Sequence, residues 1–247
     1  MEIYQLLLVA LITFGAGCIQ STTGFGFGIF SMIFLPHLLL YTEANTVAST
    51  LSMCTSATVV AATWKKMNLR NIIFPFIGCV AATYFAVYFI KSQDNTVLTL
   101  LLGIALLLLS VYFYFFSDKM KIKPTWYAGL IAGVLSGVLE GMFAIGGPPA
   151  VIYFMQSEED SDHYLATVSG YFVLLGMVSV SSKAISGFYT TNVWLSLLVG
   201  VVGMIVGSLI GKKARDKANP KLIKKSVYAV MALSGVINII TSIIGLV

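Results

Sequence analysis

The 247-residue chain is 58% apolar and only 10% charged, and its formal net charge is +5. A typical soluble domain carries about 25% charged residues, so this composition excludes a water-soluble globular protein and indicates a chain surrounded by lipid. The positive charge does not indicate nucleic acid as a partner, because the Lys and Arg residues lie in short stretches between apolar runs, where such residues orient membrane proteins.

Eight apolar segments follow one another along the chain, and each is long enough to cross about 30 Å of hydrocarbon. They lack the alternation of barrel strands, so all are predicted to be helical. They leave no room for a separate soluble domain, which predicts one all-α polytopic membrane domain over residues 1–247. The segments are residues 3–40, 44–64, 72–90, 97–116, 126–155, 164–182, 193–210 and 227–247.

The N-terminus and the cysteines argue against processing and against a metal site. No Lys or Arg precedes the first apolar run, so no removable signal peptide is predicted. Cys18, Cys54 and Cys79 lie inside apolar segments without CxxC spacing, so neither a disulfide nor a zinc site is predicted. We expect no cofactor.

The first and fifth segments are unusually long, and glycines interrupt both, at residues 24–28 and 146–149. Gly and Pro at this density break a helix. If all eight segments crossed once, the basic residues would divide almost evenly between the two sides, against the positive-inside tendency. If each broken segment is instead a hairpin, re-entrant or made of two short crossings, all but Lys91 and Lys183 of the 15 Lys and Arg residues share one side. That side is predicted to be cytoplasmic, with both termini outside.

Such hairpins predict two inverted repeats, each of one hairpin and three transmembrane helices, over residues of about 1–120 and 121–247. A constant offset in residue number between the two halves supports this prediction. It matches Gly17 with Gly137, Gln20 with Glu140, Gly24 with Ala144, Gly26 with Gly146, and Ser49 with Ser169. Chance matching between two glycine-rich stretches is the alternative.

Broken helices of inverted repeats meet near the membrane midplane, where free N–H groups and positive helix ends can hold an anion. Polar side chains gather beside both breaks, and together with the break itself they form the candidate substrate site. Each single Ser or Thr has the alternative of bonding its own helix or packing against a neighbour. The candidate residues are Gln20, Thr22, Thr23, Gly24, Gly26, Gly28, Ser49, Glu140, Gly146, Gly147, Pro148 and Ser169.

Glu140 is the one charged residue expected deep in an apolar segment, where a carboxylate costs about 2.5 to 3.5 kcal/mol on insertion scales. We interpret it as a proton-binding or gating group, the alternative being a protonated carboxyl that only packs. No Lys or Arg is predicted within the membrane, so these residues alone permit a cation almost as well as an anion. His163 directly follows an acidic stretch, residues 158–162, for which a solvated loop is favoured over a metal site.

The GFGFG arm that ends near Pro36, the GGPPAVIYF arm half a chain later and the basic loops between helices resemble the TauE/SafE family of sulfite exporters, also called the toluenesulfonate uptake permease family. The resemblance covers essentially the whole chain. It implies a multi-pass plasma-membrane transporter of sulfite, thiosulfate or organosulfonates such as sulfoacetate, isethionate or taurine. It also implies a substrate site at the glycines and Pro148 of the two arms, with Gln20, Thr23 and Glu140 beside them.

We therefore predict a secondary transporter of small sulfur-containing oxyanions that works by alternating access, with proton coupling through Glu140 as an option. An enzyme is not predicted, and no GxxxxGK[ST] loop for ATP is present. The expected partners are a small anionic solute and membrane lipid, without nucleic acid, and a homo-oligomer is left open. The alternatives are a transporter of a cation or transition metal that uses Glu140, and a passive channel or scaffold.

Overall fold

The computed structural model describes residues 2–116, 123–158, 160–214 and 220–246, and these residues form helices and no strand. This confirms the prediction of an all-α polytopic membrane protein. The α-helices are α1 (Ile3–Thr23), α2 (Phe27–Phe34), α3 (Tyr41–Thr63), α4 (Leu69–Lys91), α5 (Asn95–Phe116), α6 (Trp126–Phe143), α7 (Gly147–Ser157), α8 (Ser161–Ile185), α9 (Thr191–Ala214) and α10 (Pro220–Leu246). Two 3-10 turns, η1 (Leu35–His37) and η2 (Trp64–Lys66), follow α2 and α3.

Among the described residues, eight helices are long and apolar enough to cross a membrane. The two short helices α2 and α7 are the exceptions, with 8 and 11 residues. At a rise of about 1.5 Å per residue they span roughly 12 and 16 Å, about half of the hydrocarbon layer. Each broken segment is therefore one long helix followed by a short one that turns back.

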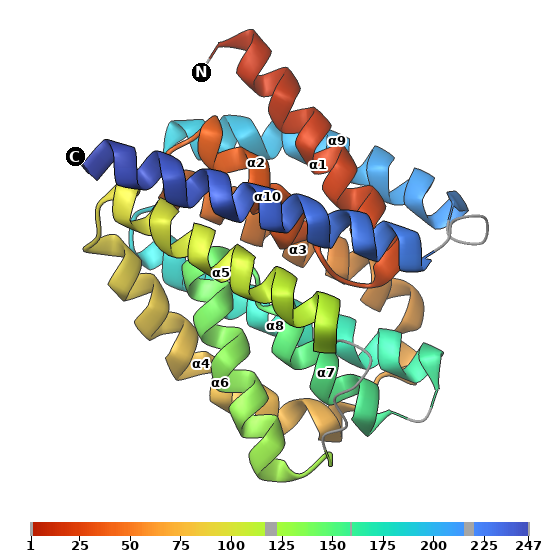
Figure 1. Ribbon diagram of the computed structural model, residues 1–247. Helices are drawn as coiled ribbons and strands as arrows, with labels where there is room; N and C mark the ends of the chain where they lie inside the picture. The colour runs from red at the N-terminus through yellow and green to blue at the C-terminus, as the bar shows by residue number, and fades with distance from the viewer. Residues whose placement is uncertain (1, 117–122, 159, 215–219, 247) are drawn as a thin grey trace.

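Each long–short pair returns toward the end of the bundle where it began (Figure 1). The pair α1 and α2 begins and ends at the upper left of the view, and the pair α6 and α7 begins and ends at the lower right. The ends of α3, α5 and α9 and the start of α6 therefore lie together toward the right and the bottom of the view. The described basic residues Lys65, Lys66, Lys123 and Lys212 belong to these ends or to the turns beside them. Lys119, Lys121, Arg215 and Lys217 lie outside the described residues.

Helix pairing relates the first five helices to the last five. α1 packs along α9, and α6, which takes the place of α1 in the second half, packs along α4. α3 packs on α8, and α5 packs on α10. In both pairs the two helices hold the same position in their respective halves. This is the pairing expected if the halves were repeats, although the inverted relation between them stays a prediction.

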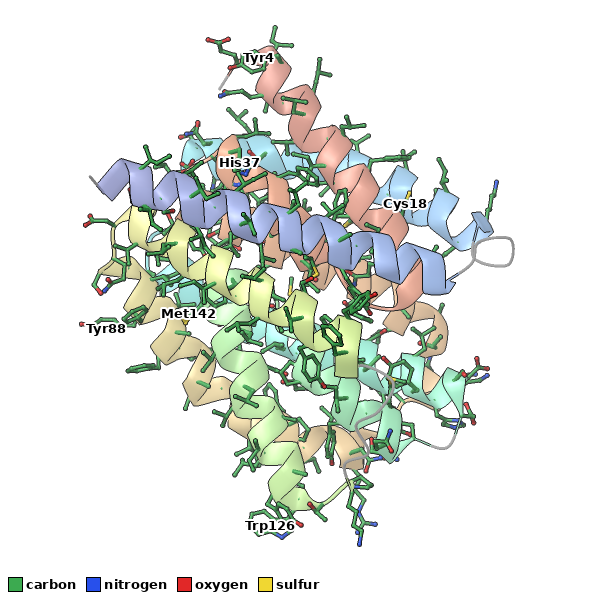
Figure 2. The ribbon with its side chains drawn as sticks, in the orientation of Figure 1. Tyr4, Cys18, His37, Tyr88, Trp126 and Met142 are labelled. Atoms are coloured by element: carbon green, nitrogen blue, oxygen red, sulfur yellow. The ribbon has the colours of Figure 1, made fainter. Side chains whose placement is uncertain are left out.

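The surface along the helices is apolar, and the interior is mixed. Large side chains such as Phe85, Tyr88 and Leu198 are more than two-thirds exposed, as expected where lipid replaces water (Figure 2). Trp64 and Trp126 are also exposed, beside the basic loops, which is the expected place of aromatic anchors. Polar side chains, in contrast, are buried between helices.

Glycines allow two of the pairs to approach closely. On α6, a side chain at Gly133 would place its Cβ 2.0 Å from the carbonyl oxygen of Pro75 on α4. On α9, a Cβ at Gly207 would lie 2.0 Å from the carbonyl oxygen of Phe14 on α1. Small residues at such interfaces let backbones pack together, which drives helix association in lipid.

We expect Gly133→Ala to destabilise the protein by about 1 to 3 kcal/mol, because the added methyl group overlaps the α4 backbone rather than a movable side chain. The measurement is the melting temperature in detergent. Val134→Ile is the matched control, since it adds one methyl group to a side chain that is 41% exposed on the same helix. Equal melting temperatures for both variants would contradict the tight α4–α6 contact.

Candidate functional site

The helices before the two breaks, α1 and α6, end in the same way. Gly24, after α1, has φ 84°, and Ala144, after α6, has φ 56°, so both residues adopt the left-handed conformation that ends a helix. The Gly24 N–H donates to the carbonyl of Gln20 at 2.8 Å, and the Ala144 N–H donates to the carbonyl of Glu140 at 2.9 Å. Both residues occupy matched positions of the predicted repeats.

The breaks lie against each other inside the bundle, as the sequence predicts. A Cβ on Gly28 would stand 1.7 Å from the carbonyl oxygen of Ala144, so the start of α2 touches the end of α6. Gly26 and Gly147, which precede and begin the short helices, line the same cavity. Two positive helix ends therefore converge on one point.

A cavity of about 30 Å³ lies at this point, enough for one or two water molecules. It brings together seven of the predicted residues: Gln20, Gly26, Gly28, Ser49, Glu140, Gly146 and Gly147. The rest of its lining is mostly apolar and was not predicted from the sequence. These residues are Phe25, Ile29, Ser52, Met53, Ala144, Ile145, Phe172, Leu175 and Gly176.

Gln20 and Glu140, matched across the halves, supply the polar walls. The Gln20 side-chain amide donates to Ser56 Oγ at 3.0 Å, while its buried Oε1 has no hydrogen-bond partner among the described residues. Glu140 is 7% exposed, and its Oε2 accepts from the Gly146 N–H at 3.2 Å. A buried oxygen without a donor is costly, so Gln20 has the capacity to bind a proton-bearing or water-bridged solute group.

The carbonyl end of α6, which would repel an anion, is covered by α3. Tyr41 donates its hydroxyl to the Met142 carbonyl at 2.6 Å, and the Asn45 Nδ2 donates to the same oxygen at 2.7 Å. The last carbonyl groups of a helix have no partner within it and carry its negative end. These donors therefore satisfy one of the carbonyl groups at the negative end of α6.

Four predicted residues lie apart from the cavity lining. Thr22 donates to the Cys18 and Ile19 carbonyls of its own helix, which is the ordinary alternative for a hydroxyl in a membrane helix. A Cβ added at Gly24 would lie 3.5 Å from Leu165 Cδ1. Pro148 lines an apolar groove with Tyr127, and Ser169 is buried within α8. The Thr23 side chain lies outside what the structure describes.

Two predictions that concern Lys183 are wrong. It was expected to face outward at a helix end, with no basic residue inside the membrane, yet its side chain is fully buried. Its Nζ donates to the Oγ of Ser49, a residue that lines the cavity, and to the Asn45 carbonyl at 3.4 Å. Because a helical side chain points back toward its own N-terminus, a lysine near the end of α8 reaches inward.

Glu43 is a third buried charge that the sequence did not single out. It is 4% exposed, and its Oε1 accepts from Thr190 Oγ1 at 2.6 Å and from Asn192 Nδ2 at 3.3 Å. Glu140 is therefore not the only buried carboxylate, but among the described residues it is the one that lines the cavity.

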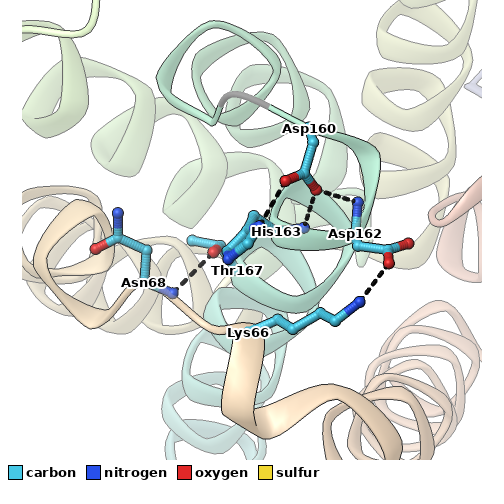
Figure 3. Close-up of polar contacts among 6 residues, drawn as sticks. All are labelled: Lys66, Asn68, Asp160, Asp162, His163 and Thr167. Atoms are coloured by element: carbon cyan, nitrogen blue, oxygen red, sulfur yellow. Dashed lines mark hydrogen bonds and ion pairs between the residues drawn. The ribbon is translucent and has the colours of Figure 1, made fainter.

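The acidic stretch before α8 forms structural contacts (Figure 3). Asp160 caps α8 by accepting from the Asp162 and His163 N–H groups, and its other oxygen lies 2.7 Å from His163 Nδ1. The His163 backbone and ring lower the pKa of the Asp160 carboxyl to about 2. Lys66 pairs with Asp162, and the Asn68 N–H donates to Thr167 Oγ1 at 3.0 Å. In the part of the chain that the structure describes, no group of three or more His, Cys, Asp or Glu side chains could hold a metal ion.

Comparison with known proteins places the whole bundle in a known group. The family model described as "Sulfite exporter TauE/SafE" matches residues 9–237. A protein of Cupriavidus necator named "Probable sulfite/organosulfonate exporter TauE" is 24% identical over 229 residues, which cover 88% of this chain and 87% of that protein. No solved structure matches this chain significantly.

The contact between the breaks can be tested with two glycines that begin the short helices. We expect Gly28→Ala to lower the melting temperature in detergent by an amount equivalent to about 3 kcal/mol, the upper end for overpacking, because its methyl group would overlap the Ala144 carbonyl. Gly147→Ala is the control, since its Cβ would have no neighbour closer than 3.7 Å. If both variants melt like the wild type, the two breaks are not in contact.

Proposed function

This chain belongs to the sulfite exporter TauE/SafE family, and we propose that it carries sulfite or small organosulfonates across the cell membrane as a secondary transporter. The family is one of transporters, so the chain is not an enzyme. The substrate class is supported by the name of the Cupriavidus necator relative, which describes it as a probable sulfite/organosulfonate exporter.

One observation carries the proposal: the N-terminal ends of α2 and α7 converge on a single internal cavity. Pro148 and Pro149 have no N–H group, and Gly146 gives its own to Glu140, so the first turn of α7 has few free donors. The first turn of α2 contains no proline, and the first four N–H groups of a helix have no acceptor within it. We place the sulfonate oxygens at Gly26 and Gly28, beside Ser49 and Ser52.

Alternating access fits the dimensions of this site. A cavity of about 30 Å³ is too small for a sulfonate group with its carbon chain, so the two breaks must separate for a solute to enter. In inverted repeats this happens when one unit rocks against the other around a fixed site. We propose that residues of about 1–120 and 121–247 are those units.

Glu140 is the proposed proton carrier. Its carboxylate would repel an anion in the same cavity, and a proton on it removes that repulsion. Entry of one anion together with one proton would keep the charge in the cavity constant, which couples uptake or release to the pH gradient.

The test is flux of labelled isethionate into proteoliposomes, with sulfite and thiosulfate as competitors and an imposed pH gradient in either direction. We expect saturable, gradient-driven flux from the wild type and at least a tenfold loss of gradient-driven flux in Glu140→Gln. Glu43→Gln is the control, because Glu43 is an equally buried carboxylate outside the cavity. Wild-type flux of Zn²⁺ or Mn²⁺ without flux of any of these anions would overturn the proposal in favour of a cation transporter.

We further propose that the basic loops face the cytoplasm and both termini face outward. In a chain whose three cysteines are replaced by alanine, Ser92→Cys should react with an impermeant maleimide in intact cells, while Lys65→Cys should react only after lysis. Both positions are exposed, at opposite ends of α4 and its preceding turn. Labelling of the Lys65 position in intact cells would reverse the orientation.

A further inference from the structure

Lys183 is a positive charge inside the membrane-spanning bundle. It is fully buried, and its partner Ser49 lies eight residues into α3, at a depth of about 12 Å along that helix. A lysine at the centre of a membrane helix costs about 2.5 to 3.5 kcal/mol on insertion scales. Such a residue is usually paired or functional.

No ion pair of Lys183 is found in the part of the chain that the structure describes. The ammonium group has three donors, and its described acceptors are neutral: Ser49 Oγ and the Asn45 carbonyl. Glu140 interacts with it electrostatically, but that carboxylate accepts its hydrogen bond from Gly146. Glu43, on α3, is instead bonded to Thr190 and Asn192. The positive charge of Lys183 is therefore balanced by an electrostatic interaction with Glu140 and not by a direct ion pair.

Ser49 connects this charge to the substrate cavity. Ser49 lines the cavity, and its Oγ accepts a hydrogen bond from Lys183 Nζ. A hydroxyl that accepts from an ammonium group is polarised, so its own proton becomes a better donor toward the cavity. Glu140 lines the same cavity directly, which places one positive and one negative group around the same small space.

We propose that Lys183 is the charge-selecting residue of the transport site: acting through Ser49, it makes the cavity favourable for an oxyanion, which replaces Glu140 as its counter-charge. The inference rests on the function proposed above. In this proposal the Lys183 side chain supplies the positive charge of the site, which helix ends and hydroxyl groups alone would supply only weakly. Removing Lys183 should weaken anion binding, and removing Glu140 should strengthen it.

Isethionate, a permanently singly charged sulfonate, is the probe, and dimethyl sulfone is its uncharged comparison. The measurement is the shift in melting temperature of the purified protein with increasing probe, because a ligand that binds the folded state stabilises it. We expect a saturable shift with isethionate and none with dimethyl sulfone. Lys183→Met should raise the apparent Kd for isethionate at least tenfold, Lys183→Arg should retain part of the affinity, and Glu140→Gln should lower the Kd. Lys91→Met is the control, an exposed lysine at the same end of the bundle, and should bind like the wild type.

A double variant separates this role from a structural charge pair. If Lys183 served only to neutralise Glu140, Lys183→Met would change nothing once Glu140→Gln is present, so the double variant would bind isethionate as tightly as Glu140→Gln, and the proposal would fail. If Lys183 selects the anion, the double variant binds isethionate at least tenfold more weakly than Glu140→Gln. Unchanged binding in Lys183→Met, with wild-type flux intact, would overturn this inference alone. Absence of anion-dependent shift and flux in the wild type would overturn the proposed function with it.

Discussion

Backbone groups that a helix break leaves free cannot be solvated by hydrocarbon, so a broken helix in a membrane has to turn its break toward protein. In this chain the two breaks turn toward each other, with Gly28 against the Ala144 carbonyl. The remaining helices surround that contact: α3 and α8 flank it, and the pairs α1–α9, α4–α6 and α5–α10 enclose the bundle. The polar interior and the apolar surface both follow from this arrangement, because only the protected centre tolerates unpaired backbone.

The charges in this centre are held apart by neutral groups. Ser49 and the Asn45 carbonyl hold Lys183, and the Gly146 N–H holds Glu140. A direct buried ion pair would satisfy both partners and is costly to break. Charges that do not contact each other leave each one open to exchange its partner, which is the property that the proposed site needs when it binds an ion and then releases it.

The fold could largely be predicted from the sequence, because lipid permits few kinds of backbone structure. Segment length gave the eight crossings, the glycines at 24–28 and 146–149 gave the breaks, and the distribution of Lys and Arg gave the hairpins. Side-chain direction within a helix was harder to predict. Thr22 bonds its own helix while Ser49 lines the cavity, and Lys183 points inward although a lysine at a helix end usually reaches out to water. The available signal for Lys183 was its position, as one of two basic residues at the sparsely charged end.

The contacts at the two ends of the bundle differ in a way that bears on the proposed transport cycle. At the basic end, Lys66 and Asp162 form an ion pair whose side chains are 51% and 68% exposed, and such pairs contribute about 0 to 1 kcal/mol. The backbone of Asn68 and the side chain of Asn71 add hydrogen bonds to Thr167 and Glu158 there. At the other end, Tyr41 and Asn45 donate to the Met142 carbonyl, and Tyr41 is almost completely buried. Opening that end would leave a carbonyl without donors in a dry environment, at about 1 to 3 kcal/mol. Rocking of the proposed units would therefore break exposed and half-buried contacts at the basic end and buried contacts at the other end.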